Sequence, residues 1–372
     1  MSRPIFIALL LLISGGCVEN SPYGFDLPEE CGNRCEKASD INSFFDAIAN
    51  SSARFSNCIC IESGELEGDL IVGKPLNIIG RKDGSSKLKG VETGIFISAD
   101  RTMLKDITIN SGTKGITIFE AENVIVQNVN ISGISVESSV VTVSDSKVYF
   151  DNFSASNIRA GSIFGGRGVV ITGKRSEVVF ENSKTDKTDS TGLLIDGEHQ
   201  VLIKNSVFSN SGFAGIWVQN LSNNTGTLEI TGSELSDNGA VSLQVLGNTR
   251  LKIDNSVLTG VSGREVNMEF VGDGIVVKND LLSQQDALHI SNLEVLNYYR
   301  AGIILDGING DLIEGVVLEQ LKTISDTGMF GVVVQNGKEP EFLREGVVEN
   351  PFTANDIGLT EPLFIIETVL EL

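Results

Sequence analysis

The chain has 372 residues, with 49 acidic and 28 basic side chains and a formal net charge of −21. A surface this acidic repels phosphate backbones, so the composition argues against nucleic acid as a partner. Aromatic residues make up 6% of the chain and glycine occurs 40 times, which favours thin stacked layers of Val, Ile and Leu over one large globular core.

The N-terminus combines a basic residue, Arg3, with an apolar run over residues 5–13. Such a run is too short to cross a bilayer and is typical of a signal peptide. It leads into Cys17 through small residues and resembles a bacterial lipobox, although Ser14 stands where that motif prefers leucine. We expect a signal peptide over residues 1–16 and a lipoprotein at the bacterial outer membrane or cell surface. Ordinary cleavage, giving a secreted or periplasmic protein, is the alternative.

The other four cysteines are Cys31, Cys35, Cys58 and Cys60, and all precede the repeats described below. An even number in an exported chain predicts two disulfides, with three pairings open. Bonds between the 31–35 segment and the 58–60 strand would pin the N-terminal end of the fold. A four-thiolate metal site is the competing interpretation. We expect residues 17–37 to contain the lipid anchor at Cys17 and a tether that includes the cysteine-containing turn.

Residues 40–49 have helical apolar spacing, and short strand-like segments with a glycine turn follow up to Gly80. From there a short pattern recurs: a small residue, an apolar one, any residue, and an apolar one. Its first residues are 23 to 34 positions apart and lie at Gly115, Val140, Gly168, Gly192, Gly215, Ala240, Gly274, Gly302 and Gly331. Units of this length hold short strands without a crossover helix, so each is one coil of a solenoid.

A second strand in each unit ends on Asn or Gly, at Asn128, Asn152, Asn182, Asn205, Gly232, Asn255, Asn292 and Gly315. These are the residues that best tolerate positive φ, so a left-handed turn residue is expected there in every coil. Stacked Asn amides can also hydrogen-bond from coil to coil.

The helix, the opening strands and the repeats together resemble a right-handed parallel β-helix of the pectin-lyase-like superfamily. The resemblance implies an all-β solenoid over residues 38–350 with an N-terminal capping helix. Residues 351–372 lose the repeat and are expected to cap the last coil. Residues 263–269 form an insertion, of the kind that often flanks a binding surface on such folds.

Enzymes of this superfamily that cleave uronic-acid polymers carry their active groups on the outward strand face, which strand parity makes readable here. On that face Asp196 and Asp306 are four coils apart, roughly 19 Å, whereas glycosidase carboxylates lie about 5 to 9.5 Å apart. The only histidines are His199 and His289, and neither lies in the Gly-His-Gly segment of polygalacturonases. A hydrolase of that kind is therefore not expected.

Two further groups on this face are candidate sites. Lys174 and Arg175 with Asp196 and His199 could supply a lyase base and a partner for a substrate carboxylate, although a solvated loop edge explains them as well.

The second group is centred on Trp217. The alternation of residues along a strand turns its ring outward, with Gln219, Gln244 and Asp196 around it. An exposed indole beside amides suits a sugar ring, and a covering loop is the competing explanation.

We therefore expect a non-catalytic surface β-helix that binds a polysaccharide or a partner protein. A polysaccharide lyase or epimerase and a structural spacer are the alternatives. No cofactor is expected. Calcium is a weak suggestion only, from the acidic segment 186–189, because no loop has a recognisable ligand spacing.

Overall fold

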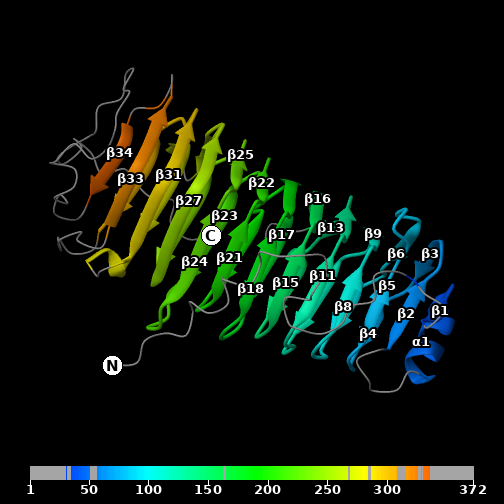
Figure 1. The fold of residues 1–372 in the computed structure, drawn as a ribbon. Helices are drawn as coiled ribbons and strands as arrows, with labels where there is room; N and C mark the ends of the chain where they lie inside the picture. The colour runs from blue at the N-terminus through cyan, green and yellow to red at the C-terminus, as the bar shows by residue number, and fades with distance from the viewer. Residues whose placement is uncertain are drawn as a thin grey trace, which may run out of the picture.

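The computed structural model describes residue 31 and residues 35–50, 57–161, 165–266, 269–283, 286–307, 316–325, 328 and 330–335. These residues form an elongated stack of coils with one short helix at its N-terminal end (Figure 1). One wall of the stack is an 11-stranded sheet, and the other two walls belong to a 21-stranded sheet. Both sheets are parallel throughout, so the prediction of a parallel β-solenoid is confirmed. The solenoid has about 11 turns.

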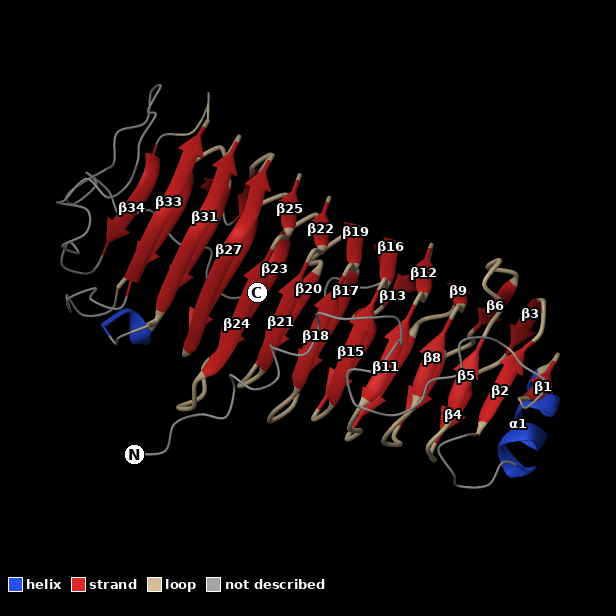
Figure 2. Cartoon of the chain, in the orientation of Figure 1, coloured by secondary structure: helices blue, strands red, loops and turns tan. Residues whose placement is uncertain are grey.

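The 11-stranded sheet takes one strand from each coil. In Figure 2 it lies mostly behind the strands of the 21-stranded sheet. Its strands are β4 (Leu70–Val72), β7 (Ile95–Ile97), β10 (Ile116–Phe119), β14 (Ser139–Ser144), β17 (Arg167–Thr172), β20 (Leu193–Asp196), β23 (Ala214–Asn220), β26 (Val241–Gly247), β30 (Asp273–Lys278), β32 (Ala301–Asp306) and β34 (Phe330–Gln335).

The 21-stranded sheet bends at the Asn turn of each coil. Before the turn lie β2 (Cys58–Ile61), β5 (Asn77–Ile79), β8 (Met103–Lys105), β11 (Val124–Gln127), β15 (Lys147–Asp151), β18 (Glu177–Glu181), β21 (Gln200–Lys204) and β24 (Gly226–Thr231). After it lie β3 (Gly64–Glu67), β6 (Ser86–Lys89), β9 (Thr108–Ser111), β12 (Asn130–Ser132), β16 (Ser154–Ala160), β19 (Lys184–Thr188), β22 (Val207–Ser209) and β25 (Glu234–Ser236). The long strands β27 (Thr249–Thr259), β31 (Leu288–Leu296) and β33 (Val316–Ile324) run through the bend. The remaining elements are β1 (Glu36–Ala38), β13 (Ser135–Val136), the hairpin β28 (Arg264–Val266) and β29 (Glu269–Val271), and the short helix η2 (Asp280–Ser283).

Alternate strand residues build a continuous apolar core inside the coils. Phe150 and Phe180 pair in register within it, and their rings lie parallel with centroids 4.8 Å apart. The ring of Phe208 meets that of Phe180 edge-on. Because each coil buries its apolar side chains against the next, the solenoid is held together between neighbouring coils.

The predicted Asn turns adopt left-handed backbone conformations at every described position. Asn205 has a φ of 48° and Gly232, its counterpart in the next coil, has 60°. The predicted turn at Gly315 lies outside the described residues, and Gln320 takes the equivalent place with a φ of 52°. Hydrogen bonds between side-chain amides also connect coils. Asn152 Nδ2, for example, donates to Asn128 Oδ1 over 2.8 Å.

Helix α1 (Ile41–Asn50) covers the N-terminal end of the core, as predicted, and buries Phe44 and Ala47. Asp40 caps it by accepting the N–H of Ser43. None of the described helices is long and apolar enough to cross a membrane.

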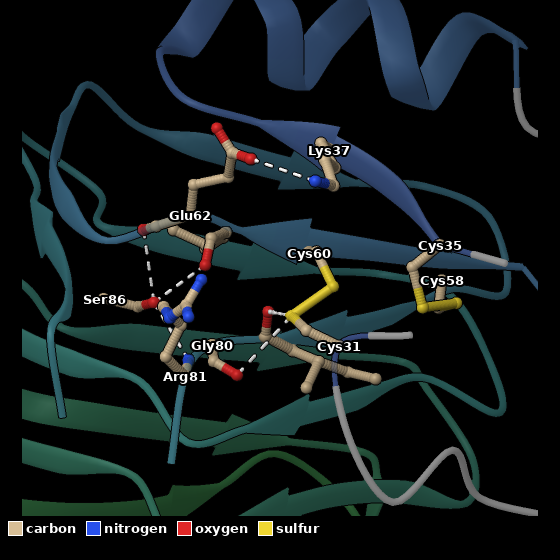
Figure 3. The surroundings of a disulfide bond; sticks show 11 residues. Cys31, Cys35, Lys37, Cys58, Cys60, Glu62, Gly80, Arg81 and Ser86 are labelled. Carbon is tan, nitrogen blue, oxygen red and sulfur yellow. Dashed lines mark hydrogen bonds and ion pairs between the residues drawn. A yellow bond between two sulfur atoms is a disulfide. The ribbon is translucent and has the colours of Figure 1, made fainter. Parts of the chain in front are cut away.

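The four cysteines after Cys17 form two disulfides, Cys31–Cys60 and Cys35–Cys58, beside this cap (Figure 3). They connect the 31–35 segment and β2, which confirms the expected pinning and settles the pairing left open by the sequence. The four-thiolate metal site is wrong because every one of these sulfurs is in a disulfide.

Residues 1–30 and 336–372 lie outside the described part of the chain. The signal peptide, Cys17, the tether and the C-terminal cap therefore remain predictions, as do the exact domain boundaries.

Candidate functional site

The outward face of the 11-stranded sheet carries two rows of side chains, each running across the coils. The first, called the tryptophan row, contains Ile71, Phe96, Thr117, Thr142, Val170, Leu194, Trp217, Gln244, Val276, Ile304 and Val333. The second, called the aspartate row, contains Phe119, Ser144, Thr172, Asp196, Gln219, Leu246, Lys278 and Asp306. The two rows define where a ligand lying along this face would make contact.

Trp217 faces outward as parity predicts, but only 3% of it is exposed, so its expected role as a sugar platform is wrong. Its ring packs 5.3 Å from that of Phe213, centroid to centroid, within an outer apolar cluster that includes Val276. Val271 of the β28–β29 hairpin also belongs to this cluster. Parity fixed the direction of the indole but gave no information on what packs over it.

Gln244 also differs from its predicted role, because it is fully buried and lies beside Trp217 in the tryptophan row. The register pairs Ala214 with Val241, which makes Ser242, and not Ala240, the counterpart of Gly215. The small residue Ala240 two positions earlier caused the error. Gln219 is half-buried and lies next to Leu246 in the other row.

His199 is 1% exposed and belongs to a hydrogen-bond ladder, so it is not an accessible base. Its Nδ1 accepts the N–H of Ser176 over 2.9 Å, and its Nε2 lies 2.8 Å from the Asp196 carbonyl oxygen. In the preceding coil Ser176 Oγ accepts the N–H of Ser146 in the same way. Burial lowers the pKa of His199, against the opposing effect of its bond to Asp196.

Lys174 and Arg175 are exposed in the turn after β17, where their backbone N–H groups bond to Asp145 Oδ1 over 2.6 and 3.1 Å. Burial alone would raise the pKa of Asp145. The hydrogen bonds from these N–H groups outweigh that effect, so the pKa is lowered overall and the carboxylate is held charged. Neither side chain forms an ion pair with Asp196 within the described residues. The proposed lyase group therefore does not converge.

Asp196 itself is exposed. Burial of the Arg167 guanidinium lowers the pKa of Arg167, and the negative charge of Asp196 partly offsets that effect. Its neighbours along the aspartate row are Thr172 and Gln219. The next carboxylate in either row is Asp306, four strands away and roughly 19 Å distant at the usual strand spacing. Asp306 is 2% exposed, and its Oδ2 forms an ion pair with Lys278 Nζ at 3.6 Å.

Between strands β4 and β17 the two rows contain an exposed stretch that the sequence analysis missed. It consists of Ile71, Phe96, Thr117, Phe119, Thr142, Ser144 and Thr172, and is called the strip below. Phe119 is 41% exposed and Ile71 59%, and the other members are half-buried. A signal for it was present, because residues 94–97 (Gly-Ile-Phe-Ile) repeat the coil pattern one unit before Gly115.

The acidic segment that suggested calcium is engaged in protein contacts. Asp186 Oδ1 accepts hydrogen bonds from Ser209 and Asn210, and Asp189 Oδ2 accepts the N–H of Ala160. Within the described residues no group of three or more His, Cys, Asp or Glu side chains is placed to hold a metal ion.

Comparison with known proteins supports the fold. A family model for right-handed β-helix regions matches residues 93–258, and no curated protein matches the sequence. The catalytic domain of a GH87 α-1,3-glucanase in complex with nigerose is similar in structure, with a TM-score of 0.54, 16% identity, and coverage of 90% of this chain and 70% of that one. An alginate lyase from Paenibacillus sp. str. FPU-7 has a TM-score of 0.47 and 13% identity, with 83% and 100% covered. The described chain is thus a parallel β-solenoid, and its residues 93–258 match the model of right-handed β-helix regions.

Proposed function

We propose that this protein is an exported, lipid-anchored β-helix that binds a polysaccharide along the strip without cleaving it. The observation that carries the non-catalytic part is that neither row holds a second carboxylate within two coils of Asp196. A glycosidase needs a second carboxyl group about 5 to 9.5 Å away, within one or two coils, and the neighbouring members of both rows are uncharged.

The placement of the candidate bases His199, Lys174 and Arg175 supports the same conclusion against a lyase or epimerase. Proton abstraction beside a substrate carboxylate needs a base within hydrogen-bond reach of the substrate. His199 already uses both ring nitrogens in protein contacts, and Lys174 and Arg175 extend from a turn beyond the strand ends.

The strip supports binding because it places two aromatic rings and four hydroxyl groups on one outward face. Aromatic faces stack on the apolar faces of sugar rings, while hydroxyls exchange hydrogen bonds with theirs. The glucanase neighbour is named for a sugar polymer and was solved with a disaccharide, which favours a polysaccharide over a protein as the ligand.

Export and anchoring rest on the N-terminal sequence, with support from the disulfides. Two disulfides in a chain of this size are typical of an oxidising compartment outside the cytosol. We propose that Cys17 carries the lipid and that the β-helix is displayed at the outer membrane or cell surface.

The test incubates purified residues 18–372 with neutral and acidic polysaccharides, with and without Ca²⁺. Retention on immobilised polymer, new reducing ends and unsaturated-product absorbance are followed in parallel. We expect retention without product. Product formation that is lost in Asp196→Asn or Lys174→Ala would contradict the proposal and establish an enzyme, and no retention on any polymer would favour the spacer.

A further inference from the structure

The strip is uncharged over its whole length. Its apolar members are Ile71, Phe96 and Phe119, and its polar members are three threonines and Ser144. Phe96 and Thr117 are direct neighbours across β7 and β10, and Phe119 lies two residues further along β10. The two aromatic rings therefore lie diagonally across adjacent coils, about 4.8 Å apart in the stacking direction, with a hydroxyl group between them.

Two of the strip's hydroxyl groups have no hydrogen-bond partner within the described residues. Thr142 Oγ1 lies 3.0 Å from Ser139 Oγ, and Ser144 Oγ donates to Asp145. Thr117 and Thr172 are half-buried and make no such bond in the described part of the chain. Their hydroxyls remain able to donate to and accept from a ligand hydroxyl.

Charged side chains border the strip at the strand ends and on the next strand, and they carry both signs. Arg167 begins β17, and Asp196 on β20 follows Thr172 in the aspartate row. Glu120 and Asp145 follow β10 and β14, while Lys174 and Arg175 follow β17. Lys114 precedes β10. A polyuronate carries a carboxylate on each sugar, so it would need a row of cations along the strands, and the strip offers none.

Long-range electrostatics acts in the same direction. A net charge of −21 repels a polyanion at distances up to the Debye length, about 10 Å at 0.1 M salt. A carboxylate pressed against Phe96 or Phe119 would also lose water without gaining a partner, which is costly. A neutral sugar meets neither obstacle.

We propose that the strip binds a neutral polysaccharide, with sugar rings on Phe96 and Phe119 and sugar hydroxyls bonded to Thr117 and Thr172. This inference rests on the proposed function and adds the chemical class of the ligand. It differs from what the pectin-lyase-like resemblance alone implies, which is a uronic-acid polymer.

Affinity electrophoresis of the full-length processed protein tests it, because the large negative charge makes the protein migrate well in native gels. The gels contain dextran, laminarin or xylan as neutral probes, and polygalacturonate or alginate as acidic ones, at about 20 and about 200 mM salt. We expect at least one neutral polymer to slow migration, with less than a twofold change in apparent affinity between the two salt concentrations. Polyuronates should have no effect.

Retardation by a polyuronate that weakens with salt would overturn the inference while leaving polysaccharide binding intact. If none of these polymers slows the protein, both the inference and the proposed function are contradicted. The two failures are therefore distinguishable.

A charge variant locates the effect. Thr117→Lys should weaken retardation by the neutral polymer at least threefold and introduce retardation by polygalacturonate at low salt. Thr227→Lys is the matched control, because it adds the same charge at an exposed position on β24 of the other sheet and should change neither. Equal effects of the two substitutions would show that binding occurs elsewhere.

Discussion

At the scale of single residues, chemically reactive side chains can be recruited to hold neighbouring coils together. His199 stands where the preceding coils have Ser146 and Ser176, and its Nδ1 accepts the same kind of backbone N–H that the serine oxygens accept. The sequence shows a lone histidine among charged residues, and the substitution within a ladder is visible only once the coils are in register.

This role predicts a pH dependence of stability. The pKa of His199 is below its ordinary value of 6.5, mainly because of burial, so the unfolded chain takes up the proton first as the pH falls. The free energy of unfolding should therefore decrease as the pH falls below about 6.5. His199→Asn, which keeps an acceptor near the Nδ1 position, should flatten that decrease in denaturant titrations across this range.

His289→Asn removes the other imidazole and is the control for the loss of a histidine. If the slope with pH is the same in His199→Asn and the wild type, the described role of His199 is incorrect.

The left-handed turns give a second test at this scale. Asn205 has a φ of 48°, a conformation that costs most side chains about 1 to 2 kcal/mol. Asn205→Ala should lower the free energy of unfolding by that amount, as measured by denaturant titration. Asn205→Gly copies the residue found at Gly232 and should cost less than half as much, so a larger loss with glycine than with alanine would contradict the account.

At the scale of elements, the order of strands and turns could be predicted because each coil repeats the same local rules. The capping helix, nearly all coil starts and the Asn turns follow from period and residue type alone. The error at Ala240 arose because two small residues, Ala240 and Ser242, both precede an apolar residue, and only the pairing with β23 distinguishes them.

The N-terminal clamp is the element whose contribution is easiest to measure. Cys35–Cys58 closes a separation of 23 residues, for which loss of the bond is expected to cost about 3 kcal/mol. The double variant Cys35→Ser/Cys58→Ser should unfold at lower denaturant concentration by a corresponding amount. Reduction of the wild-type protein should have at least as large an effect, because it also breaks Cys31–Cys60. An unchanged midpoint in both experiments would show that the disulfides do not hold the cap.

At the scale of the whole molecule, one outward face has two different characters along its length. From β4 to β17 it is uncharged and partly exposed, and from β23 onward the tryptophan row is buried. Sequence parity predicts the rows but not this division, because burial on the outside of a solenoid depends on side chains that come from other elements, such as Val271 on the inserted hairpin. The sequence analysis therefore placed Trp217 and Gln244 in an exposed site, whereas both are buried and the exposed strip lies on β4 to β17.

The central claim is that binding depends on the exposed end of this face, and one comparison tests it directly. Phe119 on β10 and Phe45 on α1 are 41% and 42% exposed, so replacing either by alanine removes a similar area of aromatic surface. Retention on the polymer that the wild-type protein binds should fall about five- to tenfold in Phe119→Ala, the size expected for loss of one aromatic contact, and stay unchanged in Phe45→Ala. Equal retention in the two variants, or a loss confined to Phe45→Ala, would contradict the account.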